Sequence, residues 1–290
     1  MSQRNASSSS AQLSAQVPGS TPALFDWLSE QLHAGFESQA LLQALVQRGW
    51  SNAIAQQAIR LLTTESPGPH SLPSGPAPAL HNAPSAIDVG DRQVEVLLSI
   101  EHPQIVLFGN VLSDAECDAI IAAARPYLHR SRTVQTQTGG EEINSDRTSE
   151  GMFFQRGQTL EVGLLETRLA HLLQWPVENG EGLQVLHYRP GAQYKPHHDY
   201  FDPAEPGTPR ILHRGGQRVG TVIVYLNEPE AGGATFFPET RLRVHPRRGH
   251  AVFFGYEKPV AETLTLHGGE PVLSGEKWIA TKWLRERHFQ

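Results

Sequence analysis

Three side chains in the C-terminal half of the chain have the types and the spacing of a metal site. His197 and Asp199 stand two positions apart, and His267 follows near the end of the 290-residue sequence. Side chains two positions apart on a β-strand share a face, so His197 and Asp199 can converge on one ion while His198 points away. Two imidazoles and one carboxylate leave three positions of an octahedral ion open, as non-haem Fe(II) oxygenases require for a chelating co-substrate and O₂.

A His-x-Asp pair is common by chance, and a lysine beyond the third residue strengthens the interpretation. Lys277 follows His267 by ten positions. On a strand over residues 276–284, Lys277, Ile279 and Thr281 share one face. A lysine inside a barrel is costly unless an anion pairs with it, and the distal carboxylate of 2-oxoglutarate is such an anion. The alternative is a surface lysine at the start of a strand, which is the commoner case for an isolated lysine.

Composition narrows the classes of protein to which the chain can belong. A net charge of −6 and a pI near 6.2 provide no basic surface for nucleic acid. No apolar run reaches the roughly 18 residues that a membrane span needs, and the N-terminus lacks the apolar region of a secretory signal. One cysteine, Cys117, excludes an internal disulfide. We therefore expect a cytoplasmic protein whose partners are neither nucleic acid nor membrane.

The N-terminal part of the sequence predicts a unit of its own. Residues 1–20 are rich in Ser, Gln and Ala without periodicity, which predicts disorder. Residues 21–63 contain three short amphipathic patterns, with Thr21-Pro22 as N-cap and first helical residue and Ser51 as the cap of the last helix. They predict a small three-helix unit. Its pattern resembles ubiquitin-associated-type modules, which bind partners, but a packing appendage or dimer contact is the favoured interpretation.

A predicted linker follows this unit, and beyond it the sequence pattern changes to one that is typical of strands. Residues 64–86 are rich in Pro, Ser and Gly, which predicts a linker. The domain expected over residues 87–290 has helices near its start, one that begins with a capping box at Ser113–Glu116 and runs to about residue 127, and one over residues 161–173. Its expected strands cover residues 93–100, 104–112, 183–188, 219–227, 242–246, 250–254 and 277–284. Short strands between Gly/Pro turns predict a mainly β fold with flanking helices, an antiparallel sandwich or double-stranded β-helix (jelly roll).

The region from about residue 100 to residue 285 resembles the prolyl 4-hydroxylase branch of the Fe(II)- and 2-oxoglutarate-dependent dioxygenases. Matching segments occur in order along the chain: HPQIVLFGNVLSDAECDAII, Arg147-Thr-Ser-x-Gly151, WPVENGEGLQVLHYRPGAQYKPHHDYF, GGQRVGTVIVYLN, GGATFFPE and LHGGEPVLSGEKWIATKW. Two small departures are Ala234, where the GGxT segment often has Glu, and the lack of an acidic residue directly before the Thr-Leu-His267 step.

The resemblance implies roles for the residues that match the family's motifs. His197, Asp199 and His267 are implied as iron ligands, and Lys277 as the partner of the 2-oxoglutarate C5 carboxylate. The implied small molecules are Fe(II), 2-oxoglutarate and O₂, with ascorbate as a reductant. A prolyl residue of a peptide or protein is the implied substrate, and succinate and CO₂ are the co-products.

Further residues are expected around the co-substrate and the substrate. Tyr188 and Tyr225 are expected to hydrogen-bond to 2-oxoglutarate, although a role as core aromatics suits them equally. Arg147 and Tyr194 are the predicted substrate contacts. Arg147 belongs to a polar, glycine-bearing segment over residues 131–151 that is expected to cover the site. A structural ion pair with a nearby carboxylate is the alternative for Arg147.

Two other functions remain open from the sequence. An oxygenase of the same class could act on a lysyl residue, a free amino acid or another small molecule, because the loops that select the substrate diverge. A jelly-roll metal protein without oxygenase activity, such as an isomerase, is the alternative from another class. Lys277 discriminates against it, because an isomerase needs no anion partner at that position.

Overall fold

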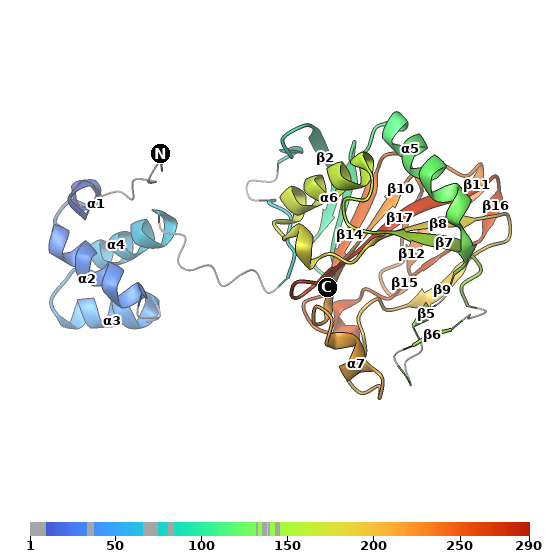
Figure 1. The fold of residues 1–290 in the computed structure, drawn as a ribbon. Helices are drawn as coiled ribbons and strands as arrows, with labels where there is room; N and C mark the ends of the chain where they lie inside the picture. Colours follow the sequence, from blue (N-terminus) through green and yellow to red (C-terminus); the bar gives the residue numbers. More distant parts are fainter. Residues whose placement is uncertain are drawn as a thin grey trace. The chain divides into compact units, whose positions relative to one another are not determined.

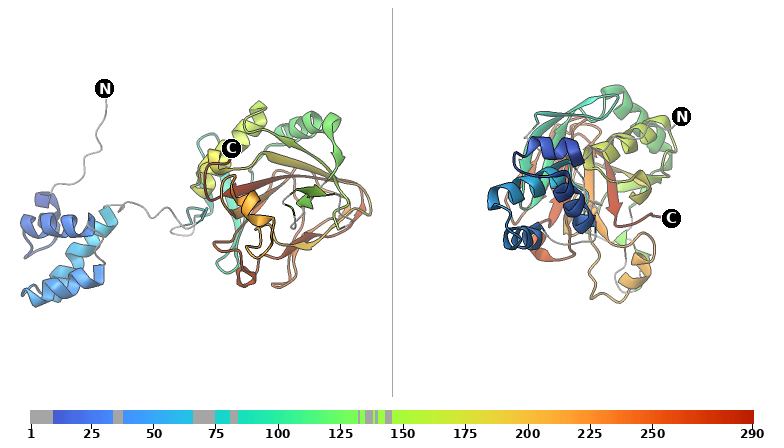
Figure 2. Two further views of the ribbon diagram at one scale, coloured as in Figure 1. Left: turned by 60° about the horizontal axis from the view of Figure 1, so that its bottom comes forward. Right: turned by 90° about the vertical axis from the view of Figure 1, so that its left-hand side faces the viewer.

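The computed structural model (Figures 1 and 2) describes residues 10–33, 38–65, 75–80, 84–131, 133–134, 138, 140–142 and 146–290. The chain divides into two compact units, residues 1–73 and residues 74–290. No helix among the described residues is long and apolar enough to cross a membrane.

The first unit is helical in its described residues. Its helices are α1 (Ser10–Gln16), α2 (Pro22–His33), α3 (Ser38–Gln47) and α4 (Asn52–Glu65). The predicted caps are present, because Leu24 N donates to Thr21 Oγ1 at 3.3 Å and Ile54 N donates to Ser51 Oγ at 3.2 Å.

The prediction of disorder over residues 1–20 is wrong for its second half. Leu13 on α1 and Val17 just after it are buried in the core shared with α2 and α4. Two buried apolar residues per short helix suffice once other helices cover them, but so few produce no periodic signal. Residues 1–9 lie outside the described residues.

The linker predicted over residues 64–86 is also shorter than expected. Residues 66–74 and 81–83 lie outside the described residues. Between them, Gly75 and Pro76 are buried, and Ala77 N donates to Leu173 O at 3.0 Å. A proline-rich extended segment has few hydrogen bonds of its own, so it can satisfy its remaining donor by packing on a neighbouring element.

This packing predicts where the chain can be shortened. Removal of residues 1–73 is expected to leave the melting temperature of the second unit unchanged, whereas removal of residues 1–86 is expected to lower it. The longer deletion exposes the surface under Pro76 and breaks the hydrogen bond from Ala77 to Leu173. Calorimetry of the two shortened chains and the full chain makes the comparison. Equal melting temperatures for the two deletions would show that residues 75–80 contribute nothing.

A nine-stranded sheet forms the larger wall of the second unit, and every pairing in it is antiparallel. Its order is β1 (Ala86–Asp88), β2 (Gln93–Ile100), β3 (Gln104–Gly109), β14 (Ala251–Gly255), β10 (Arg218–Tyr225), β17 (Lys277–Arg285), β8 (Leu183–Tyr188), β7 (Glu150–Phe154) and β4 (His129–Arg130). The strand expected to reach residue 112 ends at Gly109, because Asn110 has a φ of 57° and leaves the extended conformation.

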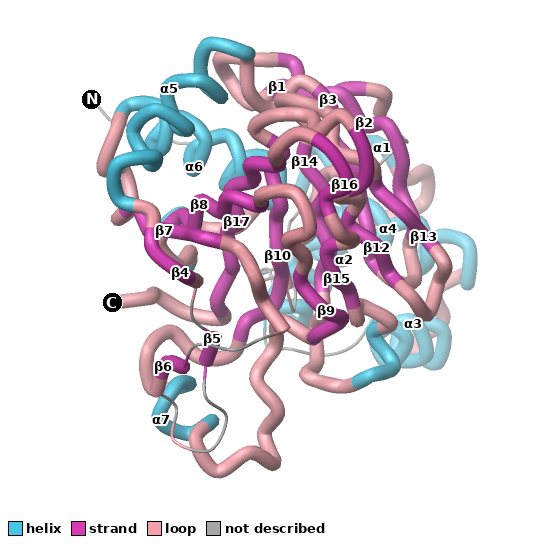
Figure 3. Tube along the Cα trace, turned by 90° about the vertical axis from the view of Figure 1, so that its right-hand side faces the viewer, coloured by secondary structure: helices cyan, strands magenta, loops and turns pink. Residues whose placement is uncertain are grey.

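A four-stranded sheet forms the smaller wall, and Figure 3 shows its strands side by side. Its order is β13 (Leu242–Val244), β12 (Thr235–Phe237), β15 (His267–Gly269) and β9 (Tyr194–His197). Two short pairs complete the strands: β11 (Ala231–Gly232) with β16 (Val272–Ser274), and β5 (Thr133–Val134) with β6 (Glu141–Glu142). The predicted jelly roll is confirmed, with antiparallel sheets that do not close into a continuous barrel. Parts of the segment over residues 131–151 lie outside the described residues.

Two helices lie together over one face of the larger sheet (Figures 1 and 2). They are α5 (Asp114–Ala124), which begins with the predicted capping box of Ser113 and Glu116, and α6 (Leu160–Leu173). The helix predicted through residue 127 ends as a 3₁₀ turn, η1 (Arg125–Tyr127), because Pro126 has no backbone N–H to continue α5. The other short helices are η2 (Val177–Asn179), α7 (Thr208–Leu212) and η3 (Ala261–Thr263).

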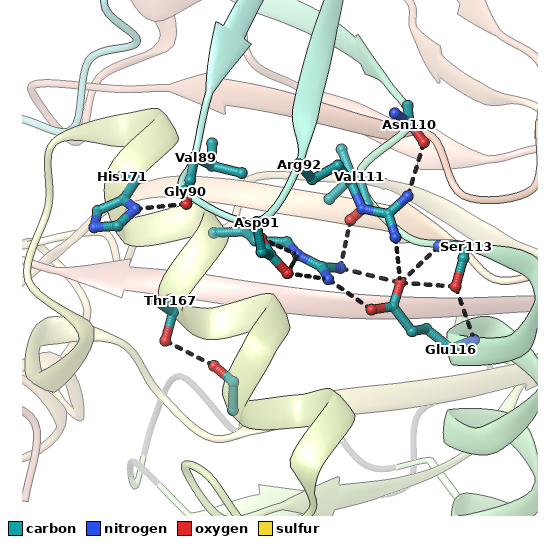
Figure 4. Close-up of polar contacts among 12 residues, drawn as sticks. Val89, Gly90, Asp91, Arg92, Asn110, Val111, Ser113, Glu116, Thr167 and His171 are labelled. Atoms are coloured by element: carbon teal, nitrogen blue, oxygen red, sulfur yellow. Dashed lines mark hydrogen bonds and ion pairs between the residues drawn. The ribbon is translucent and has the colours of Figure 1, made fainter.

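Two ion pairs of the buried Arg168 connect α6 to the start of α5 and to the loop before β2. Arg168 on α6 donates to Glu116 at 2.6 Å and to Asp91 at 2.6 Å. Figure 4 shows the carboxylates of Asp91 and Glu116 with the Ser113 cap, and His171 beside the carbonyl of Val89 at 2.9 Å. These contacts fix the helical layer on the sheet, so the opposite face of the sheet is free to form a site.

Strand β17 separates the helical layer from the interior between the two sheets. Trp278, Ala280 and Leu284 belong to the apolar core under α5 and α6. Lys277, Ile279, Thr281 and Trp283 alternate with them and line a pocket on the other side. The prediction that Lys277, Ile279 and Thr281 share one face is therefore confirmed. Every residue of the strand is buried.

Candidate metal centre

The structure brings the three predicted ligands together between the two sheets. His197 ends β9 and His267 begins β15, and the two residues stand opposite each other in this antiparallel pair. The Nε2 atom of His197 lies 3.6 Å from Oδ1 of Asp199, and the Nε2 atom of His267 lies 3.5 Å from Oδ2. One ligand atom from each residue lies within 4.8 Å of the others, which is the spacing that a single ion needs.

Backbone carbonyls orient both imidazoles. His197 Nδ1 lies 2.9 Å from the carbonyl of Lys195, and His267 Nδ1 lies 3.0 Å from the carbonyl of Thr265. A ring that donates from Nδ1 carries its lone pair on Nε2, and both Nε2 atoms face Asp199. Metal-binding histidines usually have a support of this kind, since it fixes the tautomer and the ring plane.

The charge states of Asp199 and His267 suit a divalent cation. Burial alone would favour the neutral carboxyl of Asp199, but the neighbouring His267, His197 and Arg218 outweigh it and hold the pKa well below its usual range. Burial lowers the pKa of His267 to about 4, so this imidazole is neutral at physiological pH. Two imidazoles and a carboxylate are a donor set that Fe(II) accepts, and the residues present therefore fit an iron ion.

Lys277 lies inside the protein and not on its surface. Its side chain is 2 % exposed, and it lines the same pocket as His197, Asp199 and His267. Its ammonium lies 5.3 Å from the ring centre of Tyr188 and 5.9 Å from that of Tyr225. Among the described residues no carboxylate forms an ion pair with it. A buried cation without a counter-ion, beside a metal site, fits the distal carboxylate of a bound 2-oxo acid.

The titration of Lys277 predicts a pH dependence for 2-oxoglutarate binding. Burial lowers the pKa of Lys277 to about 7, partly offset by Glu270, which pairs with Arg243 at 2.6 Å. Above that pH the free protein loses the ammonium charge, so each further pH unit is expected to raise the dissociation constant by up to about tenfold. Calorimetry from about pH 6 to about pH 9 measures it, with proton uptake on binding above the pKa.

A matched variant isolates the lysine from the other titrating groups. Lys277→Arg retains its charge throughout this range, because a guanidinium does not deprotonate in proteins. Its dissociation constant is expected to vary less with pH than that of the unaltered chain. The same pH profile for both proteins would rule out Lys277 as the group responsible.

The two tyrosines predicted near the co-substrate occupy different positions. Tyr188 lines the pocket, and its phenol interacts with Arg147 and Ser149. Tyr225 is fully buried and is not among the lining residues; its hydroxyl donates to Thr235 Oγ1 at 2.9 Å, and Thr235 lines the pocket. Tyr225 therefore reaches the pocket through Thr235, while a direct contact is open only to Tyr188.

The two predicted substrate residues lie where the inner pocket meets an open groove. Arg147 and Tyr194 line both the pocket and the groove, which has a volume of about 1060 Å³. Arg147 is 4 % exposed, donates to Gln184 Oε1 at 2.7 Å, and lies 5.0 Å above the ring of Tyr194. Tyr194 in turn stacks on His197 with ring centres 3.7 Å apart.

Several residues of the site have no signal in the sequence. Thr221 donates to Oδ2 of Asp199 at 2.7 Å and contacts the hydroxyl of Tyr256 at 2.8 Å. Arg218 donates to the carbonyl of Asp199 at 3.3 Å and lies 3.9 Å above the ring of Trp283. The hydrophobic pattern assigns Thr221 to a strand and leaves Arg218 and Tyr256 just outside the predicted strands, and only the packing of the two sheets brings Thr221 and Arg218 to Asp199.

Comparisons with known proteins agree with this geometry. Residues 183–285 match the 2OG-Fe(II) oxygenase superfamily. Prolyl 4-hydroxylase 5 of Arabidopsis thaliana is 39% identical over 222 residues, which cover 69% of this chain and 74% of the relative. Prolyl 4-hydroxylase 1 of the same plant is 40% identical over 204 residues, covering 64% of this chain and 70% of the relative.

A solved structure is similar as well. The viral collagen prolyl hydroxylase of Paramecium bursaria Chlorella virus-1, in its 2OG complex, is 32% identical, covers 62% of this chain and 95% of its own, and has a TM-score of 0.49. The matched superfamily segment contains all three candidate ligands and Lys277. From the identity to the plant enzymes and the superfamily match, the chain belongs to the prolyl 4-hydroxylase family of 2-oxoglutarate-dependent dioxygenases, which use Fe(II), 2-oxoglutarate and O₂.

Proposed function

We propose that this dioxygenase hydroxylates a prolyl residue in a peptide or protein, with succinate and CO₂ as co-products. The observation that carries the proposal is the pocket that holds both the His197–Asp199–His267 set and the buried Lys277. The relatives named prolyl 4-hydroxylases support the choice of prolyl substrate.

Each part of the pocket has a chemical task in this reaction. Bound iron and 2-oxoglutarate supply the oxidising chemistry that inserts one atom of O₂ into a C–H bond. His197, Asp199 and His267 would hold the iron on one side of the pocket and leave its other positions open. Lys277 would bind the distal carboxylate of 2-oxoglutarate, with Tyr188 beside it. Ile223, Leu186 and Ile279 line the same pocket and exclude water from it.

The groove outside the pocket is proposed to hold the peptide. Aromatic side chains line it, among them Tyr127 and Phe153, which are exposed, and Trp283, which is nearly buried. The indole N–H of Trp283 is buried and has no hydrogen-bond acceptor within the described part of the chain. Arg147 and Tyr194, at the junction of groove and pocket, are proposed to position the prolyl residue over the iron.

The test measures hydroxylated peptide and succinate in the same reaction. The full chain is incubated with Fe(II), 2-oxoglutarate and O₂ and with proline-containing peptides. Mass spectrometry is expected to show the gain of one oxygen atom on proline, with succinate formed in equal amount. Matched peptides with alanine in place of proline are expected to give no product, and His197→Ala is the enzyme control.

The same assay separates the alternative substrates. Oxygen added to a lysyl residue, a free amino acid or a small molecule, with none added to proline, would replace the prolyl substrate but retain the enzyme class. Absence of peptide-stimulated succinate across the peptides tested would contradict the proposal. Fragmentation of the product locates the hydroxyl group on the ring.

We also propose the cytoplasm as the compartment and ascorbate as the reductant that restores Fe(II) after unproductive turnover. A cysteine content of one, with Cys117 buried, suits a reducing compartment. The helical unit over residues 1–73 is proposed to contact another protein or a second copy of the chain. Light scattering of the full chain and of a chain lacking residues 1–73 tests the second of these.

A further inference from the structure

Two hydroxyl groups form a chain that ends on the carboxylate of Asp199. Thr221 lies on β10 and is fully buried. Its Oγ1 lies 2.7 Å from Oδ2 of Asp199 and 2.8 Å from the hydroxyl oxygen of Tyr256. Tyr256 directly follows β14, the strand that pairs with β10, and is 2 % exposed. The two hydrogen bonds therefore connect Tyr256, next to β14, through Thr221 on β10 to the candidate metal ligand Asp199.

The direction of both hydrogen bonds follows from the number of protons available. An ionised carboxylate only accepts, and a threonine hydroxyl has one proton to donate. Thr221 must use that proton for Asp199, so the hydroxyl of Tyr256 donates to Thr221. Donation from Tyr256 polarises the threonine hydroxyl and strengthens its bond to Asp199.

Without these two hydrogen bonds, the oxygens Oδ1 and Oδ2 of Asp199 would be nearly equivalent. Oδ1 lies 3.6 Å from Nε2 of His197, and Oδ2 lies 3.5 Å from Nε2 of His267. An ion between the imidazoles could therefore be bound by either oxygen or chelated by both. The hydrogen bond from Thr221 distinguishes them, because it occupies a lone pair of Oδ2 and reduces its negative charge, while Oδ1 keeps its full charge.

The number of oxygens bound matters for the reaction. A facial set of two imidazoles and one carboxylate oxygen leaves three positions open on an octahedral ion. Two are needed for a chelating 2-oxo acid and one for O₂. A carboxylate that binds through both oxygens would fill one of these three positions and leave too few for the 2-oxo acid and O₂.

We propose that Thr221 and Tyr256 are positioning residues that hold Asp199 as a one-oxygen metal ligand through Oδ1. The inference rests on the triad as a metal site, and it is independent of which peptide is hydroxylated. A core role alone does not account for Thr221. The residues that follow it on β10 are Val222, Ile223 and Val224, and a buried hydroxyl in such a strand is unfavourable unless it is hydrogen-bonded.

The test uses three substitutions and a metal that can be added without oxygen chemistry. Thr221→Val keeps the branched shape and removes the hydroxyl. Thr221→Ser keeps the hydroxyl and is the matched control, and Tyr256→Phe keeps the ring and removes only the donor to Thr221. Each full-length chain is freed of metal, checked by thermal unfolding, and titrated with Co(II) to obtain the dissociation constant.

The binding mode is measured by infrared difference spectra of chains labelled with ¹³C-aspartate, with and without Co(II). The separation between the two carboxylate stretches is wide for a one-oxygen ligand and narrow for a chelating one. Asp199→Ala identifies the band that belongs to this residue. We expect a wide separation for the unaltered chain and for Thr221→Ser, and a narrow one for Thr221→Val. The dissociation constant of Thr221→Val is expected to change by about tenfold or more, in the range that lost supporting contacts cause.

Tyr256→Phe is expected to change the carboxylate band separation and the Co(II) dissociation constant in the same direction as Thr221→Val, and by a smaller amount. It decides the question if Thr221→Val does not fold. An unchanged band separation in the folded variants would overturn the positioning role and leave the proposed function intact. An unaltered chain that takes up no Co(II) would overturn the metal site itself, and with it both proposals.

Discussion

Replacing His197 by alanine is expected to abolish iron retention and all 2-oxoglutarate turnover. The substitution removes one of three ligands whose donor atoms lie within 4.8 Å of one another. The effect should exceed the roughly 10- to 100-fold loss that removal of a group supporting a ligand causes. Metal content after dialysis measures retention. An anaerobic titration with Fe(II) and 2-oxoglutarate should produce a visible charge-transfer band in the unaltered chain and none in the variant.

The neighbouring histidine provides the matched control. His198 has the same residue type one position away, but its ring stacks on Tyr200 with centres 4.6 Å apart and does not face Asp199. His198→Ala is therefore expected to retain iron and the charge-transfer band. Equal loss of iron in the two variants would mean that the triad is not the metal site.

Lys277→Met is expected to stabilise the protein and at the same time to weaken 2-oxoglutarate binding. Methionine fills a similar volume and removes a buried ammonium that has no ion-pair partner in the described part of the chain, which should raise the free energy of unfolding at neutral pH by a few kcal/mol, in order of magnitude. Loss of the cation should weaken 2-oxoglutarate binding by about 2–5 kcal/mol, or about 30- to 5,000-fold. Chemical denaturation and calorimetry measure the two effects.

A second lysine on the same strand provides the opposite expectation. Lys282 faces the helical layer, where it donates to Glu166, which is 3 % exposed. Lys282→Met leaves that carboxylate buried without its cation and should cost about 3–5 kcal/mol of stability. Destabilisation by both substitutions would indicate that Lys277 has a structural ion-pair role after all.

Local spacing predicted the parts of the site that depend on one strand. The alternation of β17 places Lys277 and Thr281 on one face, as predicted. His197 and Asp199 were also predicted to share the face of a strand, but β9 ends at His197, and Asp199 reaches it from the bend that follows. Residues that support the ligands from other strands could not be predicted in this way. Tyr256 meets Thr221 because β10 pairs with β14, and Thr221 meets Asp199 because the two sheets face each other. Strand order and sheet packing are not encoded in the hydrophobic pattern of any one segment.

The predicted boundaries of the disordered N-terminus and of the linker differ from the structure for a common physical reason. Helix α1 and residues 75–80 contain few apolar residues and many small or proline residues, so composition assigned them to disorder and linker. Their order comes from surfaces supplied by other elements, the core around Phe25 and Leu28 in one case and Leu173 and Gly220 in the other. A sequence window that excludes those surfaces contains no information about them.

The alternation of strand β17 also protects the enzyme against misfolding. A one-residue slip against β8 and β10 would turn every side chain to the opposite face. Trp278 would then enter the pocket, and Lys282 would leave Glu166 without a cation. Each of these changes is unfavourable on its own, so a slipped sheet is penalised on both faces at once. Lys277, which is expected to bind the co-substrate, and Lys282 on the opposite face of β17 thus together favour the native register of this strand.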